Sequence, residues 1–142
     1  MKKNIIDQNV YYSINWSRLF GYVDKYEARR VLPELPGIIW IQNKIGKKME
    51  SSLFFACWRD GLRVGFAKLM DDLVEQHNDL REELIQYDMF YKYCVVDTHP
   101  KDLQDIMFWL IQEYKPRLND RKGFKDSERY MNIFVKEIEA NA

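Results

Sequence analysis

The hydrophobic and polar positions along the chain divide it into segments with two different periodicities. Runs rich in β-branched and aromatic residues predict strands over residues 37–43 (GIIWIQN), 52–58 (SLFFACW) and 89–96 (MFYKYCVV). The KIGKK sequence after the first run contains Gly46, which can adopt a positive φ, and it predicts a turn. The first two strands are therefore expected to form a hairpin.

Apolar positions at steps of three and four residues predict helices in much of the remaining chain. The clearest pattern runs from Leu62 to Tyr87, and acidic residues occupy much of its other surface. A second helix is expected to start near His99 and Pro100 and to stop near Pro116, because proline cannot continue a helix interior. The weaker predictions are a polar lead over residues 1–12, one or two short helices over 14–32 with Asp24 as a cap, and a final helix over 127–140.

The predicted order of elements is α-β-β-α-β-α-α. It implies a small α+β domain in which a three-stranded, mostly antiparallel sheet is flanked by helices. A chain of 142 residues suits a single domain over residues 1–142.

Composition and charge narrow the class of protein. Aromatic residues make up 15% of the chain, which supplies enough apolar surface for a core and excludes a fully disordered protein. The formal net charge is zero, so a chain devoted to nucleic acid is disfavoured, although a local basic face is still compatible with that balance. We find no internal repeat and no nucleotide-binding or nucleophile-elbow motif.

The N-terminal sequence MKKNIIDQNVYY has polar residues where a signal peptide would have its apolar region. No apolar run approaches the roughly 20 residues of a membrane span. We therefore expect a cytoplasmic protein with no membrane partner, in which Cys57 and Cys94 are reduced core thiols.

Three segments carry a resemblance to a known family. The sequences LPELPGIIWIQNKIGKK, LFFACWRDGLR and LIQEYKPRLN look like the first strand and turn, the second strand and the closing signature of the GIY-YIG nuclease superfamily. The similarity covers residues 35–119 and leaves N-terminal and C-terminal helical extensions outside it. It implies the GIY-YIG fold. In active members of that family, two tyrosines, an arginine and a glutamate that binds one divalent cation act on a phosphodiester.

This chain departs from the family at each of those positions. The residues at the two tyrosines, at the glycine of the second motif and at the glutamate are Ile39, Phe54, Ala56 and Met107. The arginine position falls near Val64 or Gly65, and its role is not transferred to the neighbouring Arg63. A thioether does not replace a carboxylate as a ligand for a hard cation such as Mg²⁺. The resemblance therefore implies a relative that has lost catalysis and has no metal site.

Other polar residues have two interpretations. Asp102 and Asp105, one turn apart, could be displaced ligands for Mg²⁺ or Mn²⁺ in a divergent active nuclease, or acids that favour the helix N-terminus. We expect His99 to cap its helix rather than to face a ligand, and we expect His77, on the apolar face of the long helix, to be partly buried rather than a base or a ligand. The spacing of the two histidines matches no zinc motif.

Basic residues near the predicted turns are candidates for weak contacts with nucleic acid: Lys44, Lys47, Lys48, Arg59, Arg63, Lys115 and Arg117. Aromatic residues that a small domain cannot easily bury are candidates either for a protein-partner surface or for contacts with the terminal elements: Tyr11, Tyr12, Trp40, Phe108 and Trp109. Three functions therefore stay open. They are a non-catalytic GIY-YIG-like domain that binds nucleic acid or a protein, a divergent active endonuclease, and an unrelated α+β interaction module.

Overall fold

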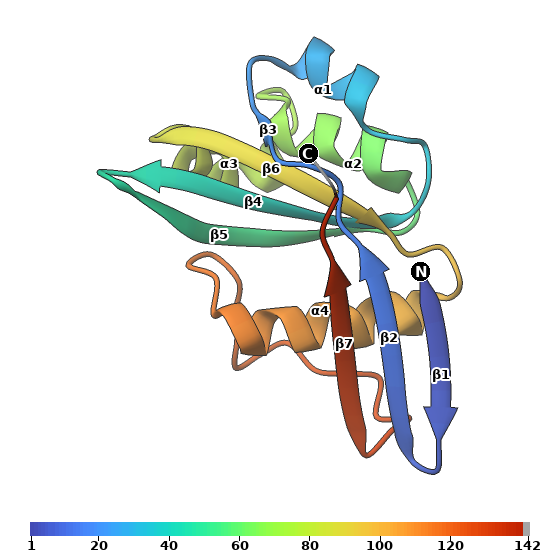
Figure 1. Cartoon of the computed structure of the whole chain (residues 1–142). Helices are drawn as coiled ribbons and strands as arrows, with labels where there is room; N and C mark the ends of the chain where they lie inside the picture. The colour runs from blue at the N-terminus through green and yellow to red at the C-terminus, as the bar shows by residue number, and fades with distance from the viewer. Residues whose placement is uncertain (141–142) are drawn as a thin grey trace.

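The computed structural model describes residues 1–140 and shows an α+β fold with two separate sheets (Figure 1). The strands are β1 (Lys2–Ile6), β2 (Asn9–Asn15), β3 (Phe20–Gly21), β4 (Gly37–Ile45), β5 (Lys48–Cys57), β6 (Asp88–Val95) and β7 (Asn132–Ile138). The helices are α1 (Lys25–Val31), α2 (Gly61–Met70), α3 (Asn78–Ile85) and α4 (Pro100–Tyr114), with a short 3-10 turn, η1 (Glu75–His77), before α3. Within these residues, every helix is too short or too polar to cross a membrane.

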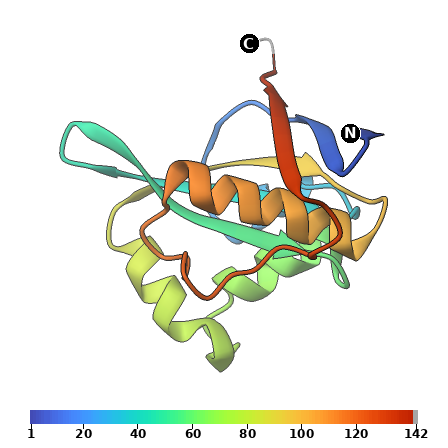
Figure 2. The ribbon, with the colours of Figure 1, turned by 90° about the horizontal axis from the view of Figure 1, so that it is seen from below.

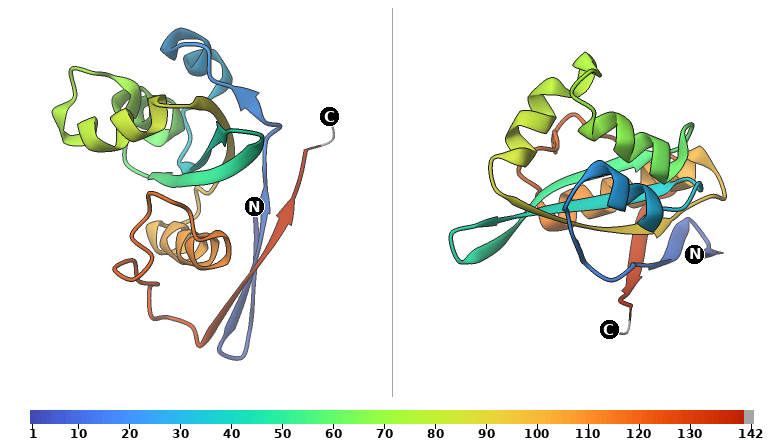
Figure 3. Two further views of the ribbon diagram at one scale, coloured as in Figure 1. Left: turned by 90° about the vertical axis from the view of Figure 1, so that its left-hand side faces the viewer. Right: turned by 90° about the horizontal axis from the view of Figure 1, so that it is seen from above.

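The larger sheet is antiparallel, with strand order β3-β6-β4-β5. Helix α4 covers one of its faces, and α1, α2 and α3 lie on the other (Figures 1 and 3). The central strand β4 is buried on both faces, which explains why GIIWI is a continuous apolar run rather than an alternating one.

The three predicted strands and their hairpin are confirmed. Residue Gly46 has φ 65° in the β4–β5 turn, as a tight hairpin requires. The prediction of three strands was incomplete, because the two residues of β3 add a fourth strand beside β6. Helix α1 begins as predicted at Asp24, whose side chain accepts hydrogen bonds from the backbone N–H groups of Tyr26 and Glu27.

The prediction of one helix from Leu62 to Tyr87 was wrong, because the chain leaves the helix after Met70. Asp71 is extended, and its carboxylate accepts a hydrogen bond from the backbone N–H of Leu73, which competes with helical bonding. The buried Arg81 then bridges the break, since its guanidinium donates to the carbonyls of Leu69 at 2.7 Å and Val74 at 3.0 Å. Apolar spacing continues across the break because α2 and α3 both pack on the same sheet.

The predictions for the two ends of the chain were also wrong. The expected polar lead and the first part of the expected N-terminal helix are β1, β2 and β3, and the expected final helix contains β7. The second sheet has the order β1-β2-β7, in which β2 runs antiparallel to β1 and parallel to β7. Alternation is visible in β2, where Val10, Tyr12 and Ile14 are buried.

Helix α4 therefore lies between two sheets. Its buried stripe includes Leu103, Met107 and Leu110, which share one core cluster with residues from β2 and from β4 and β5. Viewed from below, the chain after α4 runs back along the helix before it enters β7 (Figure 2). The ends of the chain thus cover the face of α4 that the larger sheet does not.

Candidate functional sites

The four family positions do not converge on one place. Phe54 and Met107 belong to the core cluster around α4, and the exposed Ala56 lines a cavity beside Met107. Ile39 belongs to the other core cluster, under α1 and α2, because it pairs with Phe55 and so faces the opposite side of the sheet from Phe54. Only three of the four positions lie on the α4 face.

The cavity beside Met107 has a volume of about 410 Å³. Its walls include Ala56, Leu103, Met107 and Phe124, and Lys125 is the charged residue in its lining. A hard divalent cation needs several oxygen ligands, and none of the lining side chains is a carboxylate. Within residues 1–140, no three His, Cys, Asp or Glu side chains are grouped so that they could hold a metal ion.

The Asp102 carboxylate is 2% exposed and is surrounded by donors. Its Oδ1 accepts from Lys3 Nζ at 2.8 Å, from Arg129 Nη2 at 2.9 Å and from the Tyr12 hydroxyl at 3.0 Å, and its Oδ2 accepts from Thr98 Oγ1 at 2.6 Å. Burial alone would raise the pKa of Asp102. The hydrogen bonds from Lys3, Thr98 and Arg129 outweigh burial and hold that pKa well below its usual range.

The neighbouring Asp105 is fully buried and equally satisfied. Its Oδ2 accepts from Arg129 Nη2 at 2.9 Å and from Ser127 Oγ at 2.9 Å, and its Oδ1 accepts from the Ser127 backbone N–H at 2.8 Å. The two aspartates therefore join α4 to β1, β2 and the segment before β7. A metal ion at either carboxylate would have to displace these cations and hydroxyls, so the pair acts as a structural ion-pair network.

We expect this network to make the free energy of unfolding depend on pH in the acid range. Because the folded pKa of Asp102 is depressed, its contribution is complete above the unfolded pKa and is lost as pH falls from there toward the folded pKa. The difference in unfolding free energy between wild type and Asp102→Asn should be about 1 kcal/mol smaller at pH 3 than at pH 6. Urea unfolding of both proteins at the two pH values measures it, and an unchanged difference would contradict the assignment.

The candidate basic residues fall into two groups. Lys44, Lys47, Lys48, Arg59 and Lys115 are exposed and form no ion pair with the rest of residues 1–140. The first three lie at the β4–β5 turn, whereas Arg59 follows the far end of β5, so they do not form one continuous surface. Arg63 and Arg117 are held by internal contacts instead. The guanidinium of Arg63 donates to the Leu32 carbonyl at 2.9 Å and pairs with Glu34 at 3.1 Å.

The KPRLN segment, residues 115–119, covers the open edge of β5. The backbone N–H groups of Arg117 and Leu118 donate to the carbonyls of Ser51 and Ser52. The side chain of Asn119 then bonds both backbone groups of Phe54, accepting from its N–H at 2.8 Å and donating to its carbonyl at 3.0 Å. Arg117 also donates to the buried Asn43 at 3.1 Å. The segment that resembles the closing signature of the GIY-YIG family thus protects an edge strand.

Replacing Asn119 with alanine should lower the unfolding free energy by about 2 kcal/mol, because two hydrogen bonds to the β5 backbone are lost. Urea titration measures the change. Asn15→Ala is the matched control, since Asn15 is exposed and its side chain forms no hydrogen bond within residues 1–140. Equal effects of the two substitutions would show that the edge contact is not stabilising.

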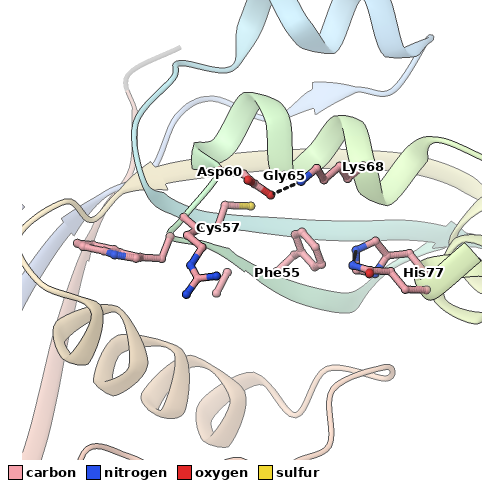
Figure 4. Close-up of a pocket in the computed structure, with 10 residues that line it drawn as sticks. Phe55, Cys57, Asp60, Gly65, Lys68 and His77 are labelled. Carbon is pink, nitrogen blue, oxygen red and sulfur yellow. Dashed lines mark hydrogen bonds and ion pairs between the residues drawn. The ribbon is translucent and has the colours of Figure 1, made fainter. Parts of the chain in front are cut away.

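A smaller cavity of about 200 Å³ lies between β5 and α2 (Figure 4). The Asp60 carboxylate pairs with Lys68 at 2.8 Å, and the His77 ring contacts Phe55 edge-on. Burial raises the pKa of the Cys57 thiol to about 12, and burial together with Arg81 lowers the pKa of His77. The thiol therefore stays protonated at neutral pH and is not an activated nucleophile.

The structure also answers three further expectations about individual residues. His99 caps α4 as predicted, since its Nδ1 accepts from the backbone N–H of Lys101 at 3.0 Å. Trp40 and Tyr12 are buried in the core cluster between α4 and the β1-β2-β7 sheet (the terminal sheet), whereas Tyr11 is 39% exposed. Cys57 and Cys94 are both free thiols, as expected.

Comparison with models of protein families gives one match. Over residues 1–142 the chain matches a family described as "Uncharacterised protein". The chain belongs to that family. No curated protein and no solved structure matches it significantly. The resemblance to the GIY-YIG nucleases therefore stays a prediction from sequence motifs.

Proposed function

We propose that this protein is a GIY-YIG-like domain that has lost phosphodiester cleavage and binds nucleic acid. The observation that carries the proposal is the surroundings of Met107. This residue occupies the expected position of the metal-binding glutamate, and the cavity beside it has mostly apolar walls and no carboxylate. Without an oxygen-liganded metal, charge that develops on phosphoryl oxygens during hydrolysis has no Lewis acid to stabilise it.

The two aspartates of α4 do not replace the missing metal-binding glutamate. Asp102 and Asp105 are committed to Lys3 and Arg129, and each carboxylate already accepts at least three hydrogen bonds. Breaking a buried ion pair typically costs about 3–5 kcal/mol, so recruiting either aspartate to a metal would compete with folding. This cost disfavours the divergent active nuclease.

Exposed cations support the binding part of the proposal. Lys44, Lys47 and Lys48 lie together at the β4–β5 turn, free of ion pairs within residues 1–140, and Lys115 is exposed at the end of α4. Contacts between such lysines and phosphate are independent of sequence and weaken as salt rises. With a net charge of zero, the expected affinity is modest.

One titration tests both parts. Purified protein is mixed with labelled single-stranded and duplex oligonucleotides in Mg²⁺, in Mn²⁺ and in EDTA, over a range of salt concentrations. We expect binding that weakens with salt and no cleavage in any condition. Metal-dependent cleavage that Asp102→Asn or Asp105→Asn abolishes, while circular dichroism shows that the variant is folded, would establish the active-nuclease alternative. Absence of binding at low salt would reject the nucleic-acid function and favour a protein partner.

A further inference from the structure

The outer face of the β1-β2-β7 sheet has a pattern that the proposed function does not yet use. One face of this sheet packs on α4, and no other segment of residues 1–140 lies over the opposite face (Figure 3, left). In β2 the buried residues Val10, Tyr12 and Ile14 point toward α4, so the alternate residues point outward.

The strand register places the outward residues in rows across the sheet. One row is Asn4, Tyr11 and Phe134, and the next row toward the end of β2 is Lys2, Ser13 and Lys136. Rows on one face are two residues apart, which is roughly 7 Å along the strands. An aromatic row therefore lies directly beside a row with a lysine on each side of Ser13.

The aromatic row presents rings to solvent. Tyr11 and Phe134 stack with ring centroids 4.9 Å apart and an interplanar angle of 13°. They are nevertheless 39% and 46% exposed. A parallel pair of rings covers one face of each, so the outer face of each ring stays available to a further flat group.

The two faces of the sheet differ in charge, because the charged residues on the outward face are all lysines. Glu137 on β7 points inward, where it accepts from Trp16 Nε1 at 2.7 Å and from the Tyr114 hydroxyl at 2.6 Å. Lys3 on β1 also points inward, to Asp102. The outward positions of the three strands include Lys2 and Lys136, which are exposed and form no ion pair within residues 1–140, and no outward position is acidic.

Amide side chains complete the face on the other side of the aromatic row. Asn132 Nδ2 donates to Asn9 Oδ1 at 2.9 Å, and the pair lies in the row beyond Tyr11 and Phe134. The same row also includes Ile6, which pairs with Asn9 and is 52% exposed, so one neighbouring row is polar and the other is mixed. The row with two lysines favours an anionic partner, because a base and its phosphates match adjacent rings and cations.

We infer that this outer face binds single-stranded nucleic acid, with bases stacked on Tyr11 and Phe134 and backbone phosphates held by Lys2 and Lys136. The inference rests on the proposed function, names single strands as its ligand class, and adds a second contact surface to the lysines of the β4–β5 turn. Bases of a duplex are already stacked on their neighbours, so the rings would not reach them. Single strands leave the base faces free, and aromatic stacking of this kind tolerates any sequence.

The test compares matched variants in a binding titration with a labelled oligo-dT and with a duplex of mixed sequence. We expect the double variant Tyr11→Ala/Phe134→Ala to bind oligo-dT at least about tenfold more weakly than wild type. Tyr11→Phe keeps the ring and should bind like wild type. Lys2→Gln/Lys136→Gln should reduce the salt dependence, with a slope in log K smaller by about 1.4. Circular dichroism and urea unfolding of each variant establish that it is folded.

The comparison variant Lys47→Gln/Lys48→Gln removes two of the cations that the proposed function uses and leaves the sheet face intact. If this variant loses oligo-dT binding while the Tyr11→Ala/Phe134→Ala variant retains it, the inference fails and the proposed function stands. If wild type binds neither oligonucleotide, both fail. Equal wild-type affinity for single strand and duplex would also overturn the inference. So would a protein dimer that depends on Tyr11 and Phe134 and excludes oligo-dT.

Discussion

Replacing Asp105 with alanine is expected to lower the free energy of unfolding by about 3–5 kcal/mol. The carboxylate is fully buried, and its loss leaves the Arg129 guanidinium with one carboxylate partner instead of two. The backbone N–H and the hydroxyl of Ser127 also lose their acceptor. Because the network joins α4 to the segment before β7, the terminal sheet should be the first part to loosen. Urea unfolding monitored by tryptophan fluorescence measures the change.

Glu113→Ala provides the matched control for Asp105. Glu113 also lies on α4, but it is exposed and makes no ion pair within residues 1–140. Its replacement should change the unfolding free energy by less than about 0.5 kcal/mol. A change below about 1 kcal/mol for Asp105→Ala would mean that water replaces the lost contacts and that the network is not a structural anchor.

The second large effect is expected at Gly37, the first residue of β4. An added Cβ there would collide with the backbone carbonyl oxygen of Cys94 on β6 and would lie 3.1 Å from Leu62 Cδ1. A backbone oxygen in a paired strand cannot rotate away as a side chain can. Gly37→Ala should therefore lower the unfolding free energy by about 3 kcal/mol, the upper part of the range for overpacking. The midpoint of thermal unfolding offers an independent measurement.

Gly21→Ala is the same substitution at an open position of the same sheet. An added Cβ at Gly21 would meet only the Phe90 ring, at 3.7 Å, which is ordinary contact. Its effect should be near zero or slightly stabilising, because alanine restricts the unfolded chain. Equal losses at both glycines would show that the approach of β4 to β6 adapts at little cost, contrary to the packing argument.

Only some of the basic side chains that were predicted from residue type alone are free of internal contacts. The lysines at the β4–β5 turn, predicted as candidates for contacts with nucleic acid, are exposed, since a hairpin turn is solvated on most sides. Arg63 and Arg117 were predicted with them, yet both are held by internal contacts. A positive charge in a polar segment gives no indication of the backbone carbonyl or buried amide that the fold brings to it. Only the neighbours in space distinguish the two groups.

Only one of the two stacked rings, Tyr11 and Phe134, was identified from the sequence as a candidate for a surface contact. Tyr11 was recognised as difficult to bury, but Phe134 was placed in a helix that the structure does not contain. The run IFV, rich in β-branched and aromatic residues, was the signal that could have identified a strand. Polarity does not alternate along this strand, because Phe134 faces outward and Glu137 faces inward. Its strand partner is more than a hundred residues earlier in the chain, and a pairing of that kind leaves no local trace.

What the sequence determined by itself is the part of the fold governed by local chemistry. The β4–β5 hairpin follows from two apolar runs and a glycine turn, α4 follows from an apolar stripe between a capping His99 and Pro116, and α1 follows from its Asp24 cap. Each depends on contacts within a few residues, so each could be inferred without knowing the rest.

Only the tertiary structure decided the remainder, for the same physical reason in each case. The terminal strands exist because β2 and β7 pair with each other and cover α4. The helix after β5 breaks because Arg81 can satisfy the carbonyls at the break. The ionised aspartates of α4 can be buried because Lys3 of β1 and Arg129 form ion pairs with them. Burial and long-range partners outweigh local propensities, which are a few tenths of a kcal/mol per residue. Short stretches of sequence indicate those propensities but not the distant partners.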